Sequence, residues 1–326
     1  MSFSATPPPD PSRIVIGALG FGSFLEENLC NKILASAYEI GIRTIDLAAS
    51  YGEGKARQLV ASYLRRNPHQ TWNLWDKMGM RMSFAGEVPT YSRDFPASPL
   101  DVVREIRGVL QQLGVEKLES FQLHLPLRFK AESHVVDGLV QAHDLGLISS
   151  VGCSNHEEFE LASLSEQLNS RGQSVSHAQV QMSLIEQLAC TSFIPKARSL
   201  SIKVVANRTF ARGLLARRNP KDSIRLKGSL RMQEYSREHR DRIQAIHDVL
   251  AEHSGFPLAQ IALSWALGPG GADRVVVGVS DENQLASAFE ATSLGLTQQF
   301  WKTLFSDERV VNMNFSSYPP SLFDTR

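Results

Sequence analysis

Residues 41–52 read Gly-Ile-Arg-Thr-Ile-Asp-Leu-Ala-Ala-Ser-Tyr-Gly, a short apolar run followed by an acid and then a phenol. The run Ile42–Ile45 predicts a β-strand, and the amphipathic segment 55–66 predicts a helix after it. Asp46 and Tyr51 therefore stand where the predicted strand ends, between the strand and its helix. A strand followed by a helix is the repeating unit of parallel sheets.

The same alternation continues along the chain. It predicts right-handed βαβ units, and about eight of them without a clear linker favour a closed (β/α)8 TIM barrel over an open sheet. The length of 326 residues fits one such domain over 13–326, after a short disordered lead over 1–12 and with an extra segment from about 295 over the barrel rim. The expected strands are 14–16, 19–21, 42–45, 72–75, 121–123, 148–151, 178–180, 203–206 and 274–277, and the expected helices are 27–40, 55–66, 100–113, 131–145, 157–168, 193–200, 237–253, 258–267 and 282–290.

Two stretches break the pattern of short connections, and we expect both to be long loops over the C-terminal face of the barrel. The first, 78–99, is rich in Gly, Pro, Ser and aromatic residues. The second, 207–235, is rich in arginine, which either forms a solvated surface or contacts cofactor phosphates or an anionic substrate group. Its arginines are Arg208, Arg212, Arg217, Arg218, Arg225 and Arg231.

The bulk composition argues against several classes of partner. With 34 basic and 34 acidic side chains the formal net charge is zero, which predicts neither a nucleic-acid nor a membrane partner. The cysteines Cys30, Cys153 and Cys190 are isolated and the histidines lack metal-binding spacing, so we expect a reducing compartment and no metal. Residues 1–12 lack the pattern of a signal peptide, and the expected location is cytoplasmic.

Two other predicted strands also end in polar side chains with chemical potential. Lys77 follows the run 72–75, and His124 follows the run 121–123. Because the C-terminal strand ends of a barrel meet in one pocket, we expect Asp46, Tyr51, Lys77 and His124 to converge there.

These four groups suit proton transfer to a carbonyl oxygen. An ammonium group held by Asp46 lowers the pKa of a nearby phenol by favouring the phenolate. Tyr51 would then donate a proton as hydride reaches the carbonyl carbon, and His124 would orient the carbonyl and stabilise the developing charge. Run in reverse, the same groups oxidise an alcohol. The alternative is that each residue only satisfies local hydrogen bonds.

The sequence resembles the aldo-keto reductase superfamily over nearly its whole length, in its longer bacterial-type branch. The resemblance starts from the Asp46–Tyr51 spacing in 41–52. It continues, in order, through Asp76-Lys-Met-Gly79, Phe121-Gln-Leu-His-Leu-Pro126, Val151-Gly-Cys-Ser-Asn155, Ala178-Gln-Val180, Arg212-Gly-Leu-Leu215, Ala262-Leu-Ser-Trp265 and Val277-Gly-Val-Ser280.

This resemblance implies an NAD(P)H-dependent enzyme whose catalytic tetrad is Asp46, Tyr51, Lys77 and His124. It also implies a substrate pocket for a small carbonyl or alcohol compound, formed by Phe24, Tyr51, His124 and Leu125. The cofactor-binding residues that it implies are Gly22, Ser23, Asp46, Ser154, Asn155, Gln179, Asn207, Arg208, Arg212, Gly278, Ser280 and Gln284, with 278–288 near the adenosine end.

The chain departs from the family pattern in the cofactor contacts. Asn207 stands where relatives place a tyrosine that stacks on the nicotinamide ring, and an amide lacks that aromatic face. The stretch 278–288 contains no Lys or Arg, although a 2′-phosphate prefers cationic partners. The family favours NADP(H), whereas this stretch makes NAD(H) a serious alternative unless Arg274, Arg208 or Arg212 supplies the charge.

The resemblance also includes two alternatives to a carbonyl reductase. One is a nicotinamide-binding partner or sensor protein of the same fold, with little or no catalysis. The other is a sugar-modifying enzyme that oxidises and re-reduces its substrate without net redox change. The intact tetrad favours the oxidoreductase.

Overall fold

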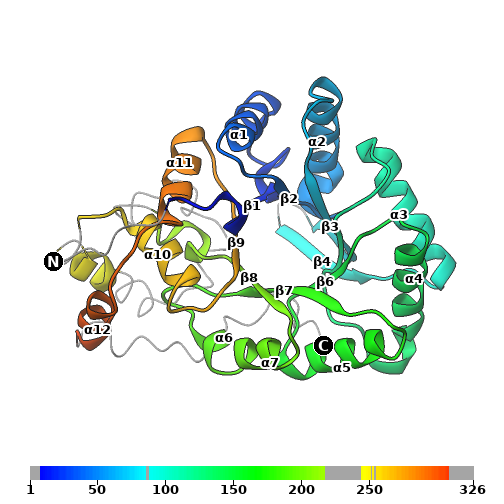
Figure 1. Ribbon diagram of the computed structural model, residues 1–326. Helices are drawn as coiled ribbons and strands as arrows, with labels where there is room; N and C mark the ends of the chain where they lie inside the picture. The colour runs from blue at the N-terminus through cyan, green and yellow to red at the C-terminus, as the bar shows by residue number, and fades with distance from the viewer. Residues whose placement is uncertain (1–7, 86–87, 217–243, 251, 253–254, 308–326) are drawn as a thin grey trace.

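The computed structural model describes residues 8–85, 88–216, 244–250, 252 and 255–307. Its strands form a nine-stranded sheet in the order β2-β1-β9-β8-β7-β6-β5-β3-β4, and pairing of β2 with β3 closes a barrel (Figure 1). The barrel strands are parallel, and β4 is antiparallel to β3. The predicted TIM barrel is confirmed. Its strands are β1 (Ile14–Gly17), β2 (Thr44–Asp46), β3 (Asn73–Ala85), β4 (Val88–Asp94), β5 (Ser120–Leu123), β6 (Val151–Ser154), β7 (Val175–Gln181), β8 (Lys203–Asn207) and β9 (Arg274–Val277).

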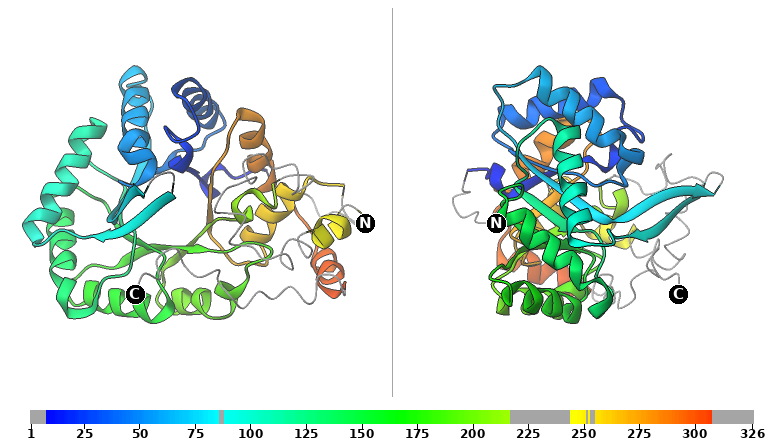
Figure 2. Two further views of the ribbon diagram at one scale, coloured as in Figure 1. Left: turned by 180° about the vertical axis from the view of Figure 1, so that it is seen from behind. Right: turned by 90° about the vertical axis from the view of Figure 1, so that its right-hand side faces the viewer.

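Helices surround the barrel (Figures 1 and 2). Local signals set their ends: α3 begins after Ser98, whose side chain accepts a hydrogen bond from the backbone N–H of Asp101, and it ends at Gly114 in the left-handed conformation. The helices with both ends among the described residues are α1 (Glu27–Glu39), α2 (Lys55–Arg66), α3 (Pro99–Leu113), α4 (Ser133–Asp144), α5 (Glu158–Asn169), α6 (Leu188–Thr191), α7 (Phe193–Ser199), α10 (Leu258–Leu267), α11 (Glu282–Ala291) and α12 (Gln298–Ser306).

Alternation along each strand separates two environments. On β2, Ile45 belongs to the main apolar core under the helices, whereas Asp46 bonds across the barrel to side chains of β3 and β7. Val15, Trp75 and Val205 form a small separate apolar cluster inside the barrel. Lys77 lies two residues after Trp75, and therefore faces the same interior.

The expected loop over 78–99 is wrong for most of its length. β3 continues past Lys77 to Ala85 and pairs with β4 as an antiparallel extension, which projects away from the barrel (Figure 2). The reason is visible in the sequence, because Met78, Met80, Met82 and Phe84 alternate with smaller or polar residues. That period of two indicates a strand despite the Gly and Pro content.

Several boundaries also differ from the predictions. The expected strand 19–21 is a 3-10 turn, Ala18–Gly20, followed by a single bridge between Phe21 and Leu25. The strand expected at 148–151 is shifted to Val151–Ser154. Residues 244–250 of the expected helix 237–253 are helical, whereas 217–235 of the second expected loop lie outside the described residues.

The first and last described segments contact the helices α11 and α10. In the expected lead, Asp10 caps a 3-10 turn, Pro11–Arg13, and its backbone N–H donates to Thr292 at the end of α11. The segment from 295 carries α12, which lies beside α10 (Figure 1). Among the described residues, the structure contains no helix with the length and apolarity that a membrane crossing requires.

Candidate active site

The four predicted catalytic side chains meet at one end of the barrel, where Asp46 ends β2, Tyr51 follows it, Lys77 lies within β3 and His124 directly follows β5. Lys77 Nζ lies 2.5 Å from Asp46 Oδ2, 3.0 Å from the backbone oxygen of Leu47 and 3.1 Å from the Tyr51 hydroxyl. The rings of Tyr51 and His124 meet edge to face, with 6.1 Å between their centroids. The structure therefore brings all four residues into one cluster.

Two glycines let Tyr51 approach this cluster. Tyr51 opens a 3-10 turn, Tyr51–Gly54, on which Gly52 has a φ of +56°. A Cβ atom at Gly52 would lie 2.8 Å from the backbone oxygen of Phe21, and one at Gly22 would lie 2.5 Å from Lys55 Cβ. Glycine at both positions allows the connections after β1 and β2 to pack closely. Gly22 and Ser23, predicted to line the cofactor cleft, lie on the first of these connections.

Burial controls the charge states of the cluster. Asp46 and Lys77 are each 1% exposed, and His124 is 6% exposed. Burial, together with the charges of Lys77 and Arg208, holds the pKa of His124 well below its ordinary value, so the imidazole is neutral. Although burial lowers the pKa of Lys77, its contacts with Asp46 and Tyr51 outweigh this and raise it, so the amine is an ammonium ion.

The expected lowering of the Tyr51 pKa is wrong in direction. Burial raises the pKa of Tyr51, and the lowering effect of the Lys77 ammonium group offsets only part of this because Asp46 also raises it. Tyr51 therefore carries its proton at neutral pH. In this state the phenol can donate a proton, and the neutral imidazole beside it can donate a hydrogen bond.

Two amides hold the other oxygen of Asp46. Gln179 Nε2 lies 2.7 Å from Asp46 Oδ1, and Gln122 Nε2 lies 3.4 Å from the same atom. Gln179 was predicted as a cofactor residue, whereas Gln122 was not predicted at all. One signal was available: Gln122 lies on β5 two residues before His124, which directly follows the strand, so alternation directs both side chains to the barrel interior.

A chain of hydrogen bonds crosses the mouth of the barrel from β8 to β5. Arg208 Nη1 donates to Gln181 Oε1 at 2.8 Å, and Gln181 Nε2 donates to Asn155 Oδ1 at 3.3 Å. Asn155 Nδ2 then donates to the backbone oxygen of His124 at 2.9 Å. Arg208 and Asn155 both have a φ of +57°, a strained conformation that commonly marks functional positions.

The remaining predicted residues on β6 and β8 lie close to this chain. Ser154, at the end of β6, is buried. Asn207 ends β8, and its buried Oδ1 atom has no hydrogen-bond partner within the described chain. Such an acceptor at the barrel mouth suits a ligand N–H or O–H group. The side chain of Arg212 lies outside the described residues.

The predicted adenosine-end residues form a separate group at the start of α11. The Asp281 carboxylate caps this helix by accepting from the backbone N–H of Gln284, and Gln284 Oε1 accepts from the backbone N–H of Ser280. Gly278 lies on the connection between β9 and this cap. The positive end of α11 therefore already faces an acidic side chain.

Arg274, named above as a possible phosphate ligand, lies at the other end of β9 and does not reach this group. Its Nη2 donates to Thr44 Oγ1 at 2.7 Å, and its guanidinium carbon lies 4.8 Å from the Trp75 ring centroid. Trp75 also stacks on His177, with 4.1 Å between the ring centroids. These residues fill the N-terminal end of the barrel interior, which we call the barrel floor. Each is one of the first three residues of its strand.

The predicted substrate-pocket residues differ in exposure. Phe24 is 48% exposed on the connection after β1, whereas Leu125, directly after His124, is buried. A Cβ atom at Gly20 would lie 2.7 Å from the Phe24 ring, so this glycine leaves room for the aromatic side chain. Phe24 is thus an accessible apolar side chain on the same connection as Gly22.

A buried ion pair supports Lys77 from the opposite face of β3. Arg57 Nε and Nη2 donate to the two carboxylate oxygens of Asp76 at 2.8 and 2.7 Å. Asp76 Oδ1 also accepts from the backbone N–H of Lys77 at 2.6 Å. Because Asp76 is fully buried, this bidentate pair anchors the strand directly behind the Lys77 amine.

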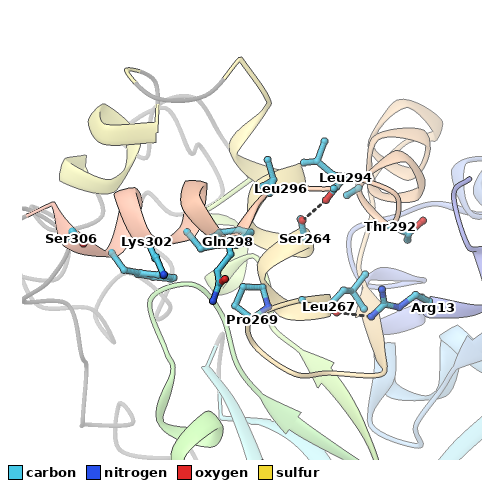
Figure 3. Close-up of a pocket in the computed structure, with 15 residues that line it drawn as sticks. Arg13, Ser264, Leu267, Pro269, Thr292, Leu294, Leu296, Gln298, Lys302 and Ser306 are labelled. Carbon is cyan, nitrogen blue, oxygen red and sulfur yellow. Dashed lines mark hydrogen bonds between the residues drawn. The ribbon is translucent and has the colours of Figure 1, made fainter. Parts of the chain in front are cut away.

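A pocket of about 670 Å³ lies elsewhere, between α10 and α12 (Figure 3). It is lined by Leu267 and Pro269, which precede β9, by Arg13, which precedes β1, and by Lys302 of α12. Arg13 directly precedes β1, so the pocket lies toward the N-terminal strand ends, opposite the tetrad. Within the described chain, no group of three or more His, Cys, Asp or Glu side chains is arranged to hold a metal ion.

Comparison with known proteins gives a consistent result. The sequence profile of the aldo/keto reductase family matches residues 13–306. An uncharacterized oxidoreductase of Bacillus subtilis is 24% identical, with 90% of this chain and 91% of the relative covered. D-threo-aldose 1-dehydrogenase of a Pseudomonas species is also 24% identical, over 92% of this chain and 97% of the relative. The structure of a glycerol dehydrogenase from Gluconobacter oxydans superposes with a TM-score of 0.79 at 21% identity, covering 97% of each chain.

Proposed function

Since this chain belongs to the aldo/keto reductase family, we propose that Tyr51 is the general acid/base of its nicotinamide-dependent reaction, which reduces an aldehyde or ketone to an alcohol or runs in reverse. The chain is an oxidoreductase of carbonyl and alcohol groups. The proposal concerns which residues perform the chemistry and which dinucleotide they use.

The observation that carries the proposal is the position of Lys77 between Asp46 and Tyr51. The ammonium group contacts both oxygens, at 2.5 and 3.1 Å, in an interior from which water is largely excluded. As Tyr51 gives up its proton to a carbonyl oxygen, Lys77 stabilises the phenolate that forms, and Asp46 keeps Lys77 in place. His124 is neutral, so it donates a hydrogen bond to the carbonyl oxygen without competing for the proton.

The residues at the barrel mouth fit a nicotinamide dinucleotide. Asn207 offers a buried oxygen without a partner in the described chain, and Gly22 lets the connection after β1 pack against Lys55. Ser154, Asn155 and Gln179 would hold the carboxamide, since hydroxyl and amide groups both donate and accept. A reduced nicotinamide bound there supplies the hydride for the carbonyl carbon.

Within this function we propose that the protein prefers NAD(H) to NADP(H). The support comes from α11, where the Asp281 carboxylate occupies the helix N-terminus and Glu282 adds a second acid. A 2′-phosphate at this position would meet two like charges, whereas a ribose hydroxyl could donate to a carboxylate. Arg274 is committed to the barrel floor. Arg208 donates to Gln181 at the barrel mouth.

The first experiment is a titration of the purified protein with NADH and, separately, with NADPH, followed by tryptophan fluorescence. Turnover is then measured with the tighter cofactor on an aldose, glycerol and a simple aromatic aldehyde. Tighter binding of NADH together with turnover on any of these supports the proposal. Tighter binding of NADPH overturns the cofactor preference alone. If a cofactor binds but neither cofactor supports turnover, the role of Tyr51 is overturned.

The alternative functions have no support from the comparisons. The relatives reported above are named as an oxidoreductase and as dehydrogenases. A versiconal hemiacetal acetate reductase of Aspergillus parasiticus, 22% identical over 88% of this chain and 91% of its own length, is likewise named for a reduction. No observation favours a non-catalytic partner protein or a redox-neutral enzyme.

A further inference from the structure

Asp46, Gln122 and Gln179 form a closed ring of hydrogen bonds inside the barrel. Gln179 Nε2 donates to Asp46 Oδ1 at 2.7 Å and to Gln122 Oε1 at 2.9 Å, and Gln122 Nε2 completes the ring to Asp46 Oδ1 at 3.4 Å. The exposed fractions of these side chains are 1% for Asp46, 0% for Gln122 and 2% for Gln179. The ring therefore joins a catalytic acid to a residue at the proposed carboxamide site.

The chemistry of Asp46 sets the orientation of both amides. Because its carboxylate forms an ion pair with Lys77, Asp46 can only accept hydrogen bonds. The atoms of Gln122 and Gln179 that face it must then be the NH2 groups. Both N–H bonds of Gln179 are used within the ring, so the atom that Gln179 can offer to a ligand is its carbonyl oxygen.

Packing holds Gln122 in this position. Gln122 is paired in register with Gly152 on β6, and a Cβ atom at Gly152 would lie 2.9 Å from Gln122 Cγ. It would also lie 2.7 Å from His177 Nε2. The absence of a side chain at Gly152 therefore leaves the space that the Gln122 side chain occupies on its way to Asp46.

We propose that Gln122 is a positioning residue that couples cofactor recognition to the catalytic acid. By accepting one N–H of Gln179, it holds the Gln179 carbonyl oxygen toward the carboxamide NH2 of a bound nicotinamide. By donating to Asp46, it steadies the carboxylate that holds Lys77. This inference rests on the proposed function, because Gln179 must contact the nicotinamide for Gln122 to act through it.

A double-mutant cycle on cofactor affinity tests the first half of the proposal. Dissociation constants for NAD+ and for ADP-ribose, which lacks the nicotinamide, are measured by tryptophan fluorescence for wild type, Gln122→Met, Gln179→Met and the double variant. We expect Gln122→Met to weaken NAD+ binding about tenfold, the effect of one lost buried hydrogen bond, and to leave ADP-ribose binding unchanged. In the Gln179→Met background the Gln122 substitution should have no further effect.

A second variant, Gln122→Glu, tests the proposal even if Gln122→Met does not fold. It also tests the contact between residue 122 and Asp46. The carboxyl group introduced by Gln122→Glu can, when protonated, accept from Gln179 and donate to Asp46, which preserves the ring. When ionised it lies against a second carboxylate. NAD+ affinity and kcat of this variant should approach wild type at the acid end of the pH range and fall about tenfold relative to wild type as the pH rises.

Ser120→Ala is the matched control. Ser120 lies on β5 one interior position below Gln122, is fully buried, and has an Oγ atom without a hydrogen-bond partner in the described structure. The Ser120→Ala variant should bind NAD+ and ADP-ribose with the same dissociation constants as wild type. Equal weakening of NAD+ and ADP-ribose by Gln122→Met, additive effects in the cycle, or a pH-independent Gln122→Glu variant would overturn the inference.

The wild-type protein separates this inference from the function on which it rests. If wild type binds NADP+ more tightly, the cycle is run with NADP+ and 2′-phospho-ADP-ribose. Wild-type protein that binds neither dinucleotide overturns the proposed function, and the inference falls with it. Wild-type protein that binds normally and is unaffected by Gln122→Met overturns the inference alone.

Discussion

The ammonium nitrogen of Lys77 lies 3.1 Å from the hydroxyl oxygen of Tyr51. Burial raises the pKa of this phenol, so Tyr51 is protonated at neutral pH and, in the proposed reaction, would meet a carbonyl substrate as an acid. The contact with Lys77 matters after the proton has left, because a nearby positive charge stabilises phenolate much more than phenol. The pair is thus arranged to lower the cost of proton donation rather than to ionise Tyr51 in advance.

Replacing the phenol should remove turnover while leaving the cofactor site intact. We expect Tyr51→Phe to lower kcat for carbonyl reduction by at least about 100-fold, because general acid catalysis typically contributes that much or more. The dissociation constant for NADH should stay within about twofold of wild type, since no predicted carboxamide contact is removed. Steady-state kinetics and fluorescence titration check the two halves. Turnover close to wild type would exclude Tyr51 as the proton donor.

The ion pair between Lys77 and Asp46 should be important for stability as well as for chemistry. Lys77→Met leaves the Asp46 carboxylate buried without its partner, so we expect the free energy of unfolding to fall by about 3 kcal/mol and turnover to be lost. Adding Asp46→Asn removes the unpaired charge, and should recover much of the stability but none of the turnover. Urea denaturation and kinetics measure both variants. If the double variant is less stable than Lys77→Met, unpaired charge is not the cause of the instability.

Glu105, on α3, should make stability depend on pH. Burial raises its pKa from 4.5 to about 7; Asp94 and Asp76 add to this, and Arg57 and Arg81 oppose it. Because the folded-state pKa lies above the unfolded one, this group's stabilising contribution is complete below about pH 4.5 and is lost as the pH rises through 7.

The Glu105→Gln variant isolates this effect. We expect it to raise the free energy of unfolding by about 2 kcal/mol at pH 8.5 and to change it little near pH 4.5. Denaturant midpoints at the two pH values measure the difference. Glu116→Gln, at an exposed position after the same helix, makes the same change in net charge and is the control. A gain of the same size at both pH values would show that ionisation of Glu105 is not responsible.

Asp281 should set the choice between the two dinucleotides. Serine caps helices as well as aspartate does, so Asp281→Ser keeps the start of α11 while removing a negative charge. We expect NADPH to bind about fivefold more tightly and NADH to change less than about twofold, because only the 2′-phosphate gains from the lost repulsion. Asp144→Ser, an exposed acid on α4, controls for net charge. Equal changes for both cofactors would argue against this role.

The sequence predicted the barrel and the tetrad because both depend on local patterns. Short apolar runs alternate with amphipathic segments, and Asp46, Lys77 and His124 each follow or end such a run. Once the strands are parallel, residues at their C-terminal ends must meet. The structure places these side chains together, with Lys77 between Asp46 and Tyr51.

Other features depended on distant parts of the chain. The extension of β3 to Ala85 requires β4 as its partner, and glycine and proline in the segment obscured the alternation. Arg274 was named as a possible phosphate ligand, but its position at the start of β9 directs it to Trp75 on the barrel floor. Gln122, two residues before His124, was given no role from the sequence, because only closure of the barrel brings its side chain to Asp46 and Gln179.

The sequence by itself determined which residue types follow the barrel strands, the alternation of those strands with helices, and the acidic start of α11. These follow from short-range propensity and periodicity, which neighbouring residues specify. The tertiary structure decided the charge states and the partners, including the protonated Tyr51, the neutral His124 and the second acceptor oxygen of Asp46. A pKa and a buried hydrogen bond depend on which groups surround a side chain in space. In this protein those groups come from separate strands, and the largest separation in the cluster is the 133 residues between Asp46 and Gln179.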